Sequence, residues 1–307
     1  MARANSSPTL RGWGILRLFM MKKFELTTEF TNFLGTKLFR IKALVKFGDV
    51  EKGELGGFVE KEENLDHFGD AWIRDNAEVS GNARVSGNAW VSGNAWVRGD
   101  AQVSGDACVC GDAQVYGNAQ ASGNARVSDN ARVSGDARVS GNAWVRGDAQ
   151  VSGNAQVSGN AWVCGNAQVS GNAQASGNAR VSDNARVSGN AWVRGDAQVY
   201  GDARVSDNAR VCGNARIYGD ARVRGNACVG DNHMYATITG FGSHCRNTTF
   251  FVTKDGSIGV SSGCFCGTLE QFREKVKETH KDTKYAKEYL MIADLMEMHF
   301  KEEKVLG

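Results

Sequence analysis

The eighteen residues AWVRGDAQVSGNAQVSGN at 143–160 contain one six-residue unit three times over, and this unit decides the fold. From Ala71 to Ala227 an alanine occurs at every sixth position without an insertion, which gives 27 consecutive units. Their consensus is A-x-V-S-G-N. Self-similarity at such a short fixed period is the signature of a solenoid rather than of a mixed globular core.

Each unit reads as a short strand followed by a corner. In an extended segment, residues two apart share a face, so the alanine and the valine point to one side and the x residue to the other. The Gly-Asn or Gly-Asp pair then turns the chain, because these residues tolerate a positive φ. Three units close most simply into a triangular coil. The sequence therefore predicts an all-β solenoid, a parallel β-helix of about nine coils, over residues 70–232.

The third position of the unit is aliphatic nearly throughout. Isoleucine replaces valine at 73 and 217, and alanine replaces it at 121 and 175.

Two longer patterns are superimposed on the unit. Residues 119–135 recur at 173–189, an offset of three whole coils that keeps every residue on its face. The segment GNAWVRGDAQV at 93–103 recurs after 48 and 96 residues, which are not whole coils, so we expect Trp96, Trp144 and Trp192 on three different faces.

The repeat resembles a known superfamily. The run V-x-G-N-A-x is similar to the hexapeptide pattern of left-handed parallel β-helix proteins, which include many acyltransferases. Residues 37–65, KLFRIKALVKFGDVEKGELGGFVEKEENL, resemble the N-terminal cap of transferase-labelled hexapeptide proteins of enteric bacteria, prophages and phages. Residues 248–282 resemble a small domain that recurs in phage and gut-bacterial proteins. The resemblance implies a left-handed helix, a phage or prophage origin, and association into a trimer or another homo-oligomer.

The flanking segments lack the repeat. Residues 1–20 are basic and acid-free, and we interpret them as a disordered extension or an upstream start, with a targeting peptide as the alternative. Residues 21–69 are expected to cap the first coil, since open strand edges promote polymerisation. Residues 233–307 are predicted to form a ββαα module: a hairpin at Asp255-Gly256, then a helix capped by Thr268. The apolar face of the second helix should comprise Tyr285, Tyr289, Ile292, Leu295, Met296 and Phe300.

Composition narrows the function classes. The net charge of +2 gives no global attraction to nucleic acid, so a nucleic acid partner is not expected. Most of the eight cysteines occur singly at repeat positions, which is not a disulfide framework and favours the cytoplasm. No run approaches the ~20 apolar residues of a membrane-spanning helix.

No catalytic residue is predicted. The hexapeptide acyltransferases use a histidine near a coil edge, but all five histidines here lie outside the uninterrupted units. His67 just before the first coil and His233 just after the last could face an end groove, although a histidine at such a junction is more often structural. An acyltransferase-like enzyme with a site between subunits is therefore the first alternative function.

Outward x positions supply the candidate binding residues. Arg186, Arg204 and Arg222 should stack in successive coils, where like charges repel unless an anion or nearby aspartates offset them. Trp72 and Trp90 should be neighbours on another face. These residues are the predicted binding set. A nucleotide- or anion-sequestering, anti-defence protein is therefore the second alternative.

A metal site is a weaker idea. His244, Cys245, Cys264 and Cys266 gather four possible ligands, but their spacing is not that of a standard zinc site. No metal and no cofactor are predicted. The favoured interpretation is a non-catalytic scaffold, a rigid spacer that displays a C-terminal module for a protein partner.

Overall fold

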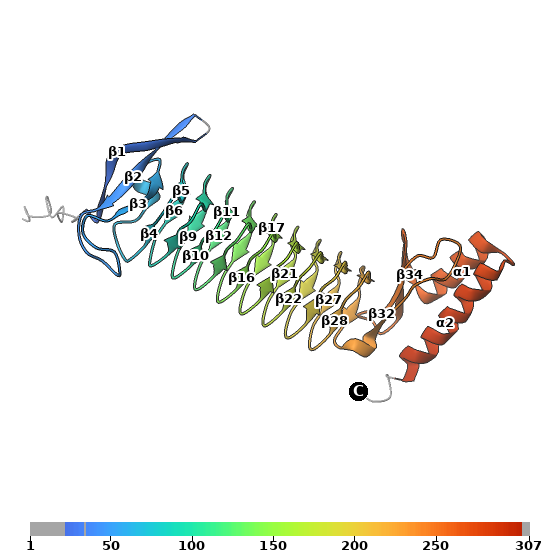
Figure 1. Cartoon of the computed structure of the whole chain (residues 1–307). Coiled ribbons are helices and arrows are strands. Elements are labelled where there is room, and N and C mark those ends of the chain that lie inside the picture. Colours follow the sequence, from blue (N-terminus) through green and yellow to red (C-terminus); the bar gives the residue numbers. More distant parts are fainter. Residues whose placement is uncertain (1–21, 34, 303–307) are drawn as a thin grey trace, which may run out of the picture.

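The computed structural model describes residues 22–33 and 35–302. It shows a long β-solenoid with a cap at its N-terminal end and a module of strands and helices at its C-terminal end (Figure 1). The predicted extension over residues 1–20 lies outside the described residues. In the described part of the chain, neither helix has the length and apolar character needed to cross a bilayer.

Twenty-seven two-residue strands build the solenoid within the described residues, from β4 (Trp72–Ile73) to β30 (Cys228–Val229). Each strand consists of the second and third residues of one unit. It pairs in parallel with the strand one coil further on, as β16 (Trp144–Val145) does with β19 (Trp162–Val163). The offset is 18 residues, so three strands complete a coil and the predicted nine coils are confirmed.

The strands form three parallel faces. Face 1 contains β5 (Glu78–Val79) and every third strand up to β29 (Arg222–Val223). Face 2 runs from β4 to β28 (Arg216–Ile217), and face 3 from β6 (Arg84–Val85) to β30. The 48-residue copies do fall on different faces, with Trp96 on face 1, Trp144 on face 2 and Trp192 on face 3.

The core is a stack of identical small residues. The alanine and the third-position side chain of the units point inward and are 0–1% exposed. Valine stacks on valine, as Val145 does on Val163, and each buried valine stabilises the fold by about 1.5–3 kcal/mol. The two small exceptions, Ala121 and Ala175, both lie on face 3, and each is paired with a valine on either side.

Each corner from Gly69 to Gly225 depends on a residue with positive φ. Gly147 has a φ of 70°, and a Cβ placed on it would lie 3.1 Å from the amide nitrogen of Gly165 in the next coil. Aspartate takes this position at four corners, including Asp129 with a φ of 60°. Asparagines beside the glycines form ladders; the Asn142 amide donates to Asn160 and the Asn160 amide to Asn178, each at 3.0 Å. The corners are thus fixed by the backbone and by side chains.

The N-terminal cap extends face 1. The antiparallel strands β1 (Phe24–Phe33) and β2 (Thr36–Ala43) are followed by β3 (Leu55–Val59), which pairs in parallel with β5. The short helix η1 (Glu62–Asn64) leads to Leu65, which bridges Val85 on face 3. The cap therefore begins an incomplete coil ahead of the nine regular ones, and it covers the first strand edge.

The C-terminal module is richer in strands than the predicted ββαα arrangement. Its elements are β31 (Tyr235–Ile238), β32 (Thr248–Val252), β33 (Ile258–Ser262), β34 (Phe265–Thr268), α1 (Leu269–His280) and α2 (Lys284–Glu302). The four strands form an antiparallel meander in sequence order. The sequence missed β31, which has no tight-turn signal beside it, and β34, in which Gly267 disfavours a strand. The capping box of Thr268 and Gln271 is present as predicted.

The module closes the other end of the solenoid. Ala227 in the last unit forms an antiparallel bridge with Thr253, and the Lys254 amide donates to the Asn226 carbonyl at 3.0 Å. The Arg222 amide donates to Oγ1 of Thr249 on β32 at 2.9 Å. Strand β32 therefore covers the edge of the last coil, and both ends of the solenoid are occupied.

Candidate anion-binding groove

The outward tryptophans differ sharply in their surroundings. Trp72 pairs with Trp90 on face 2, but Trp72 is 0% exposed and therefore not a surface residue, contrary to the prediction. The cap covers it, with the rings of Phe47 and Phe24 at centroid distances of 5.3 and 6.4 Å. The repeat period could not reveal this burial, because it predicts on which face a residue lies but not whether another segment covers that face.

The remaining tryptophans of face 2 already have cationic partners. The Arg74 guanidinium lies 4.2 Å from the Trp90 ring centroid. Trp144 and Trp162 stack at 5.1 Å with an interplanar angle of 1°. Arginines of the adjacent coils lie over these two rings at 4.9 and 5.3 Å. These contacts stabilise the face itself, each by about 0.5–1 kcal/mol at an exposed site.

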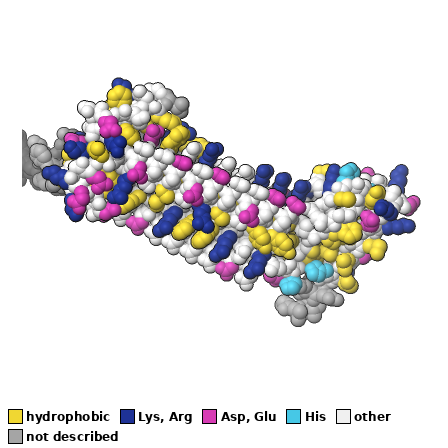
Figure 2. Space-filling model, in the orientation of Figure 1, with side chains coloured by type: hydrophobic (Ala, Val, Ile, Leu, Met, Phe, Trp, Pro, Cys, Tyr) yellow, Lys and Arg dark blue, Asp and Glu magenta, His cyan; other side chains and the backbone are white. Residues whose placement is uncertain are grey.

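The arginine ladder of face 1 is placed differently. Arg186 pairs with Arg204, and Arg204 with Arg222, in register on successive coils. Elsewhere on the three faces, the neighbours of an outward arginine are Gln, Trp or Cys. Figure 2 shows Lys and Arg side chains in such a row on the solenoid beside the C-terminal module. The ladder is therefore the one run of three outward arginines in the described solenoid.

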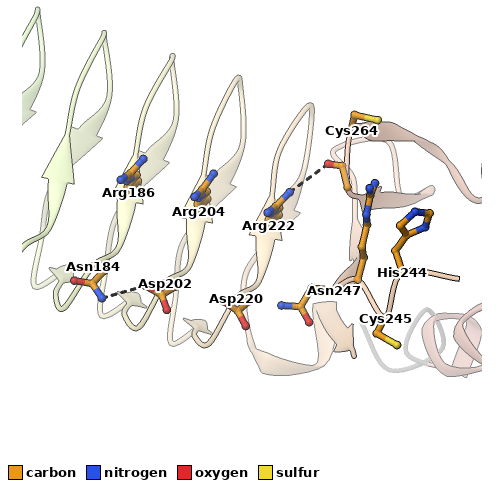
Figure 3. A pocket seen from close by; sticks show the side chains of 12 residues that line it. Asn184, Arg186, Asp202, Arg204, Asp220, Arg222, His244, Cys245, Asn247 and Cys264 are labelled. Carbon is orange, nitrogen blue, oxygen red and sulfur yellow. Dashed lines mark hydrogen bonds between the residues drawn. The ribbon is translucent and has the colours of Figure 1, made fainter. Parts of the chain in front are cut away.

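The ladder lines a groove of about 820 Å³ where face 1 meets the C-terminal module. Figure 3 shows the three arginine side chains in line, with Asp202 and Asp220 at the neighbouring corner and His244, Cys245 and Cys264 beyond the Arg222 end of the row. Two predicted sets, the arginines and three of the metal candidates, thus meet in one place. Arg246 and Asn247, from the segment before β32, also line it.

The turn at Gly263 organises the closed end of this groove. Its carbonyl accepts hydrogen bonds from Nη1 of Arg222 and Nη2 of Arg224, each at 3.2 Å. A Cβ at Gly263 would lie 2.6 Å from Nη1 of Arg246, so the missing side chain lets this guanidinium approach the turn. Sequence reasoning missed Arg246, because nothing in a non-repetitive loop indicates which coil it will face.

The charges in the groove are unbalanced. Four arginines and two aspartates line it, and among the described residues Arg186, Arg204 and Arg246 form no ion pair. The carboxylate of Asp202 instead accepts a hydrogen bond from Asn184 at 3.0 Å. Arg186 and Arg204 are exposed, whereas Arg222 is partly covered. The groove therefore presents positive charge that the protein itself does not neutralise.

Three of the four metal candidates line the groove, but the four do not form a ligand cluster. Cys266 lies away from the groove beside Gly225, and burial raises the pKa of its thiol. His244 Nδ1 is 2.8 Å from the Ser243 hydroxyl. Among the described residues, no group of three or more histidine, cysteine, aspartate or glutamate side chains could hold a metal ion.

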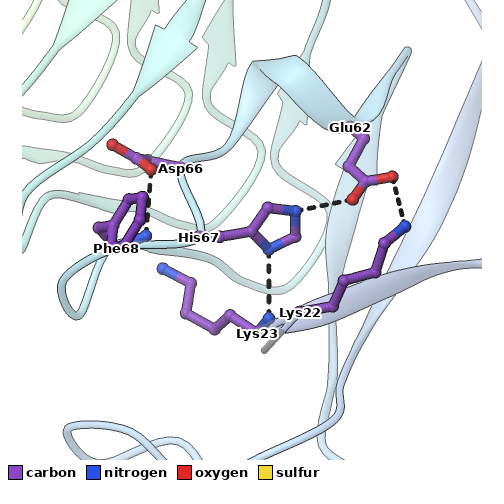
Figure 4. A network of polar contacts seen from close by, with 6 residues as sticks. All are labelled: Lys22, Lys23, Glu62, Asp66, His67 and Phe68. Atoms are coloured by element: carbon purple, nitrogen blue, oxygen red, sulfur yellow. Dashed lines mark hydrogen bonds and ion pairs between the residues drawn. The ribbon is translucent and has the colours of Figure 1, made fainter. Parts of the chain in front are cut away.

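His67, at the N-terminal end, is held by hydrogen bonds on both ring nitrogens (Figure 4). Nδ1 accepts from the Lys23 amide at 3.2 Å, so Nε2 carries the proton toward Glu62 at 2.7 Å. Lys22 also pairs with Glu62, at 2.9 Å. A ring in this state cannot take up a substrate proton without breaking the contact to Lys23. His233 lies in η2 (Asn232–Met234) at the other end of the solenoid, where its amide donates to Asp231.

Comparison with known proteins supports the fold. Residues 90–192 match the family model described as Bactofilin, polymer-forming cytoskeletal. Residues 77–93, 197–213, 209–225 and 215–231 match the model described as YdcK beta solenoid repeat. No curated protein matches the chain. The chain is a β-helix repeat protein, similar over part of its length to these two families.

Proposed function

We propose that this chain is a non-catalytic structural protein in which the solenoid, residues 70–232, acts as a rigid spacer. It would hold the cap, residues 21–69, and the C-terminal module, residues 233–307, a fixed distance apart. The observation that carries the proposal is the run of nine coils without an insertion, closed at both ends. At ~4.8 Å per coil the spacer is about 43 Å long.

The similarity to a bactofilin model supports a structural role and self-association. The two covered ends limit the form that self-association takes. On face 1 the first coil is overlaid by β3 and the last by β32, so neither of these coils presents a free strand edge there, and the sheet ends instead on β1 of the cap. We propose side-by-side association into a homo-oligomer such as a trimer rather than end-to-end growth.

Helix α2 offers a surface for protein contact. Met291, Leu295 and Met298 are 72%, 49% and 56% exposed and recur at the spacing of one helix face. Leu295 was predicted on the buried face and is not there, whereas Ile292 and Met296 are buried as predicted, together with Ala293. We propose that this outer stripe is where the C-terminal module contacts a protein partner, and a second copy of the chain is the first partner to test.

The eight unpaired cysteines support a reducing compartment such as the cytoplasm.

Sedimentation and electron microscopy of the full chain test the proposal. We expect discrete particles of defined mass. Removing residues 1–69 should uncover the first coil and produce end-to-end aggregates or filaments. Filaments formed by the full chain at moderate concentration would show that the protein is itself a polymer and not a capped spacer.

A further inference from the structure

We propose that the groove between face 1 and the C-terminal module binds a linear oligophosphate through Arg186, Arg204 and Arg222. This function goes beyond that of a spacer, because it gives one end of the solenoid a ligand. The ligand class is defined by the phosphate chain, as found in inorganic triphosphate or in the triphosphate of a nucleotide.

The spacing of the ladder selects an extended anion. The three arginines are fixed in register by the parallel pairing of their strands, at ~4.8 Å intervals along the solenoid axis. A ligand that satisfies all three must carry several negative groups in a line. Each guanidinium can form two parallel hydrogen bonds to phosphate oxygens, which makes arginine well suited to this ligand.

The electrostatics of the ligand-free groove favour the same class of ligand, an extended polyanion. Like charges in adjacent coils repel, and the protein provides no ion pair for Arg186, Arg204 or Arg246 within the described residues. A polyanion removes this repulsion when it binds. Asp202 and Asp220 lie along the neighbouring corner, so an anion would lie over the row of arginine side chains, away from these carboxylates.

The described lining of the groove lacks the large aromatic side chains on which a nucleobase stacks most strongly. This lining consists of arginine, aspartate, asparagine, cysteine, histidine and glycine, without a Phe, Tyr or Trp. We therefore expect the groove to recognise the phosphate groups of a nucleotide and not its base. Inorganic triphosphate and a nucleoside triphosphate are expected to bind with similar affinity, and inorganic phosphate far more weakly.

Calorimetric titration of the full chain, at low ionic strength and without divalent cations, tests the proposal. The probes are inorganic triphosphate, ATP, inorganic phosphate and citrate. Arg204→Gln should weaken triphosphate binding about tenfold to a hundredfold, the effect of losing one charged hydrogen-bonding group. Glutamine already occupies this position in other coils of face 1, at Gln114, Gln150 and Gln168, so the variant should fold.

Arg132→Gln is the matched control, since it makes the same change on the same face away from the groove, between Gln114 and Gln150. It should leave binding unchanged. A thermal melt adds a second readout: without ligand, Arg204→Gln should be at least as stable as the parent, because it removes like-charge repulsion. The proposal is overturned if triphosphate does not bind, if only ATP binds, if citrate binds equally well, or if both variants lose affinity alike.

Discussion

The carboxylate of Asp129 accepts a hydrogen bond from the amide of Gly147, one coil further along, at 3.0 Å. Asp75, Asp183 and Asp207 make the same contact to Gly93, Gly201 and Gly225. Aspartate can therefore replace glycine at a corner because the new hydrogen bond offsets the strain of its positive φ.

Two substitutions at one corner test this explanation. Gly147→Ala should lower the free energy of unfolding by about 1–2 kcal/mol, because alanine is strained in the left-handed backbone conformation and forms no compensating hydrogen bond. Gly147→Asp should be milder, since its carboxylate can accept from Gly165 and recover about 1 kcal/mol. Urea denaturation measures both. Equal losses would mean that the aspartate contact does not stabilise the corner.

The buried ammonium of Lys23 makes stability depend on pH. Its Nζ donates to the carbonyls of Gly69 and Ala71 at 3.2 and 2.9 Å, and burial lowers its pKa to about 8. Between pH 8 and 10.5 the unfolded chain binds more protons than the folded one, so stability should rise with pH by about 1–3 kcal/mol. The neutral amine keeps two N–H donors for the two carbonyls.

Denaturation of the parent and of Lys23→Met across pH 7–10.5 separates this contribution from other titrations. The methionine variant should be less stable at every pH because both carbonyls lose a donor. Its stability should lack the rise seen in the parent. If the two curves run parallel, Lys23 is charged in the folded state throughout this range.

Cys110 should be the most reactive thiol of the solenoid near neutral pH. A hydrogen bond from Cys108 lowers the pKa of Cys110 to about 7, and the same contact raises the pKa of Cys108. Since the thiolate is the nucleophile, alkylation of Cys110 by iodoacetamide should rise with a midpoint near pH 7. Peptide mass spectrometry would follow it. In Cys108→Ala the midpoint should move up toward 8.5; an unchanged profile would exclude Cys108 as the cause.

The exposed stripe of α2 should govern self-association. Leu295→Glu places a charge beside Met291 and Met298 without disturbing the buried face of the helix, and should shift the sedimentation profile toward the monomer. Thr279→Glu, a change at an exposed position of α1, should not. An oligomer that tolerates Leu295→Glu would place the interface on the solenoid faces instead.

The repeat made most of the fold predictable. Strand positions, the number of coils, the inward residues and the face of each outward residue all follow from a period of six that never slips. Prediction failed where that period ends. Trp72 has the sequence context of any other outward residue, yet Phe24 and Phe47 bury it.

The groove was predictable only in part. Periodicity places Arg186, Arg204 and Arg222 in line, because their spacing equals one coil. It cannot show that the turn at Gly263 binds Arg222, or that Arg246 lines the same groove, since these contacts depend on how a non-repetitive module packs on the last coil. Leu295 was misplaced for a related reason: its helix carries apolar residues on two faces.

The spacer proposal makes a geometric prediction about chain length. Deleting residues 119–172 removes three whole coils, and the sequence after the new junction, AQASGNARVSDNARVSG, is the same as the one it replaces. Deleting residues 141–188 also preserves the local sequence but removes 48 residues, so the C-terminal module should turn by one face relative to the cap. The two deletions thus separate length from orientation.

Small-angle X-ray scattering of the 119–172 deletion is the most direct test of a rigid modular spacer. If the coils are structurally equivalent and can be removed without disturbing the others, the shortened protein will fold cooperatively. Its maximum dimension will fall by about 14 Å, three times the ~4.8 Å strand spacing. Its oligomeric state will not change. An unfolded or aggregated product, or a maximum dimension equal to that of the parent, would contradict the spacer.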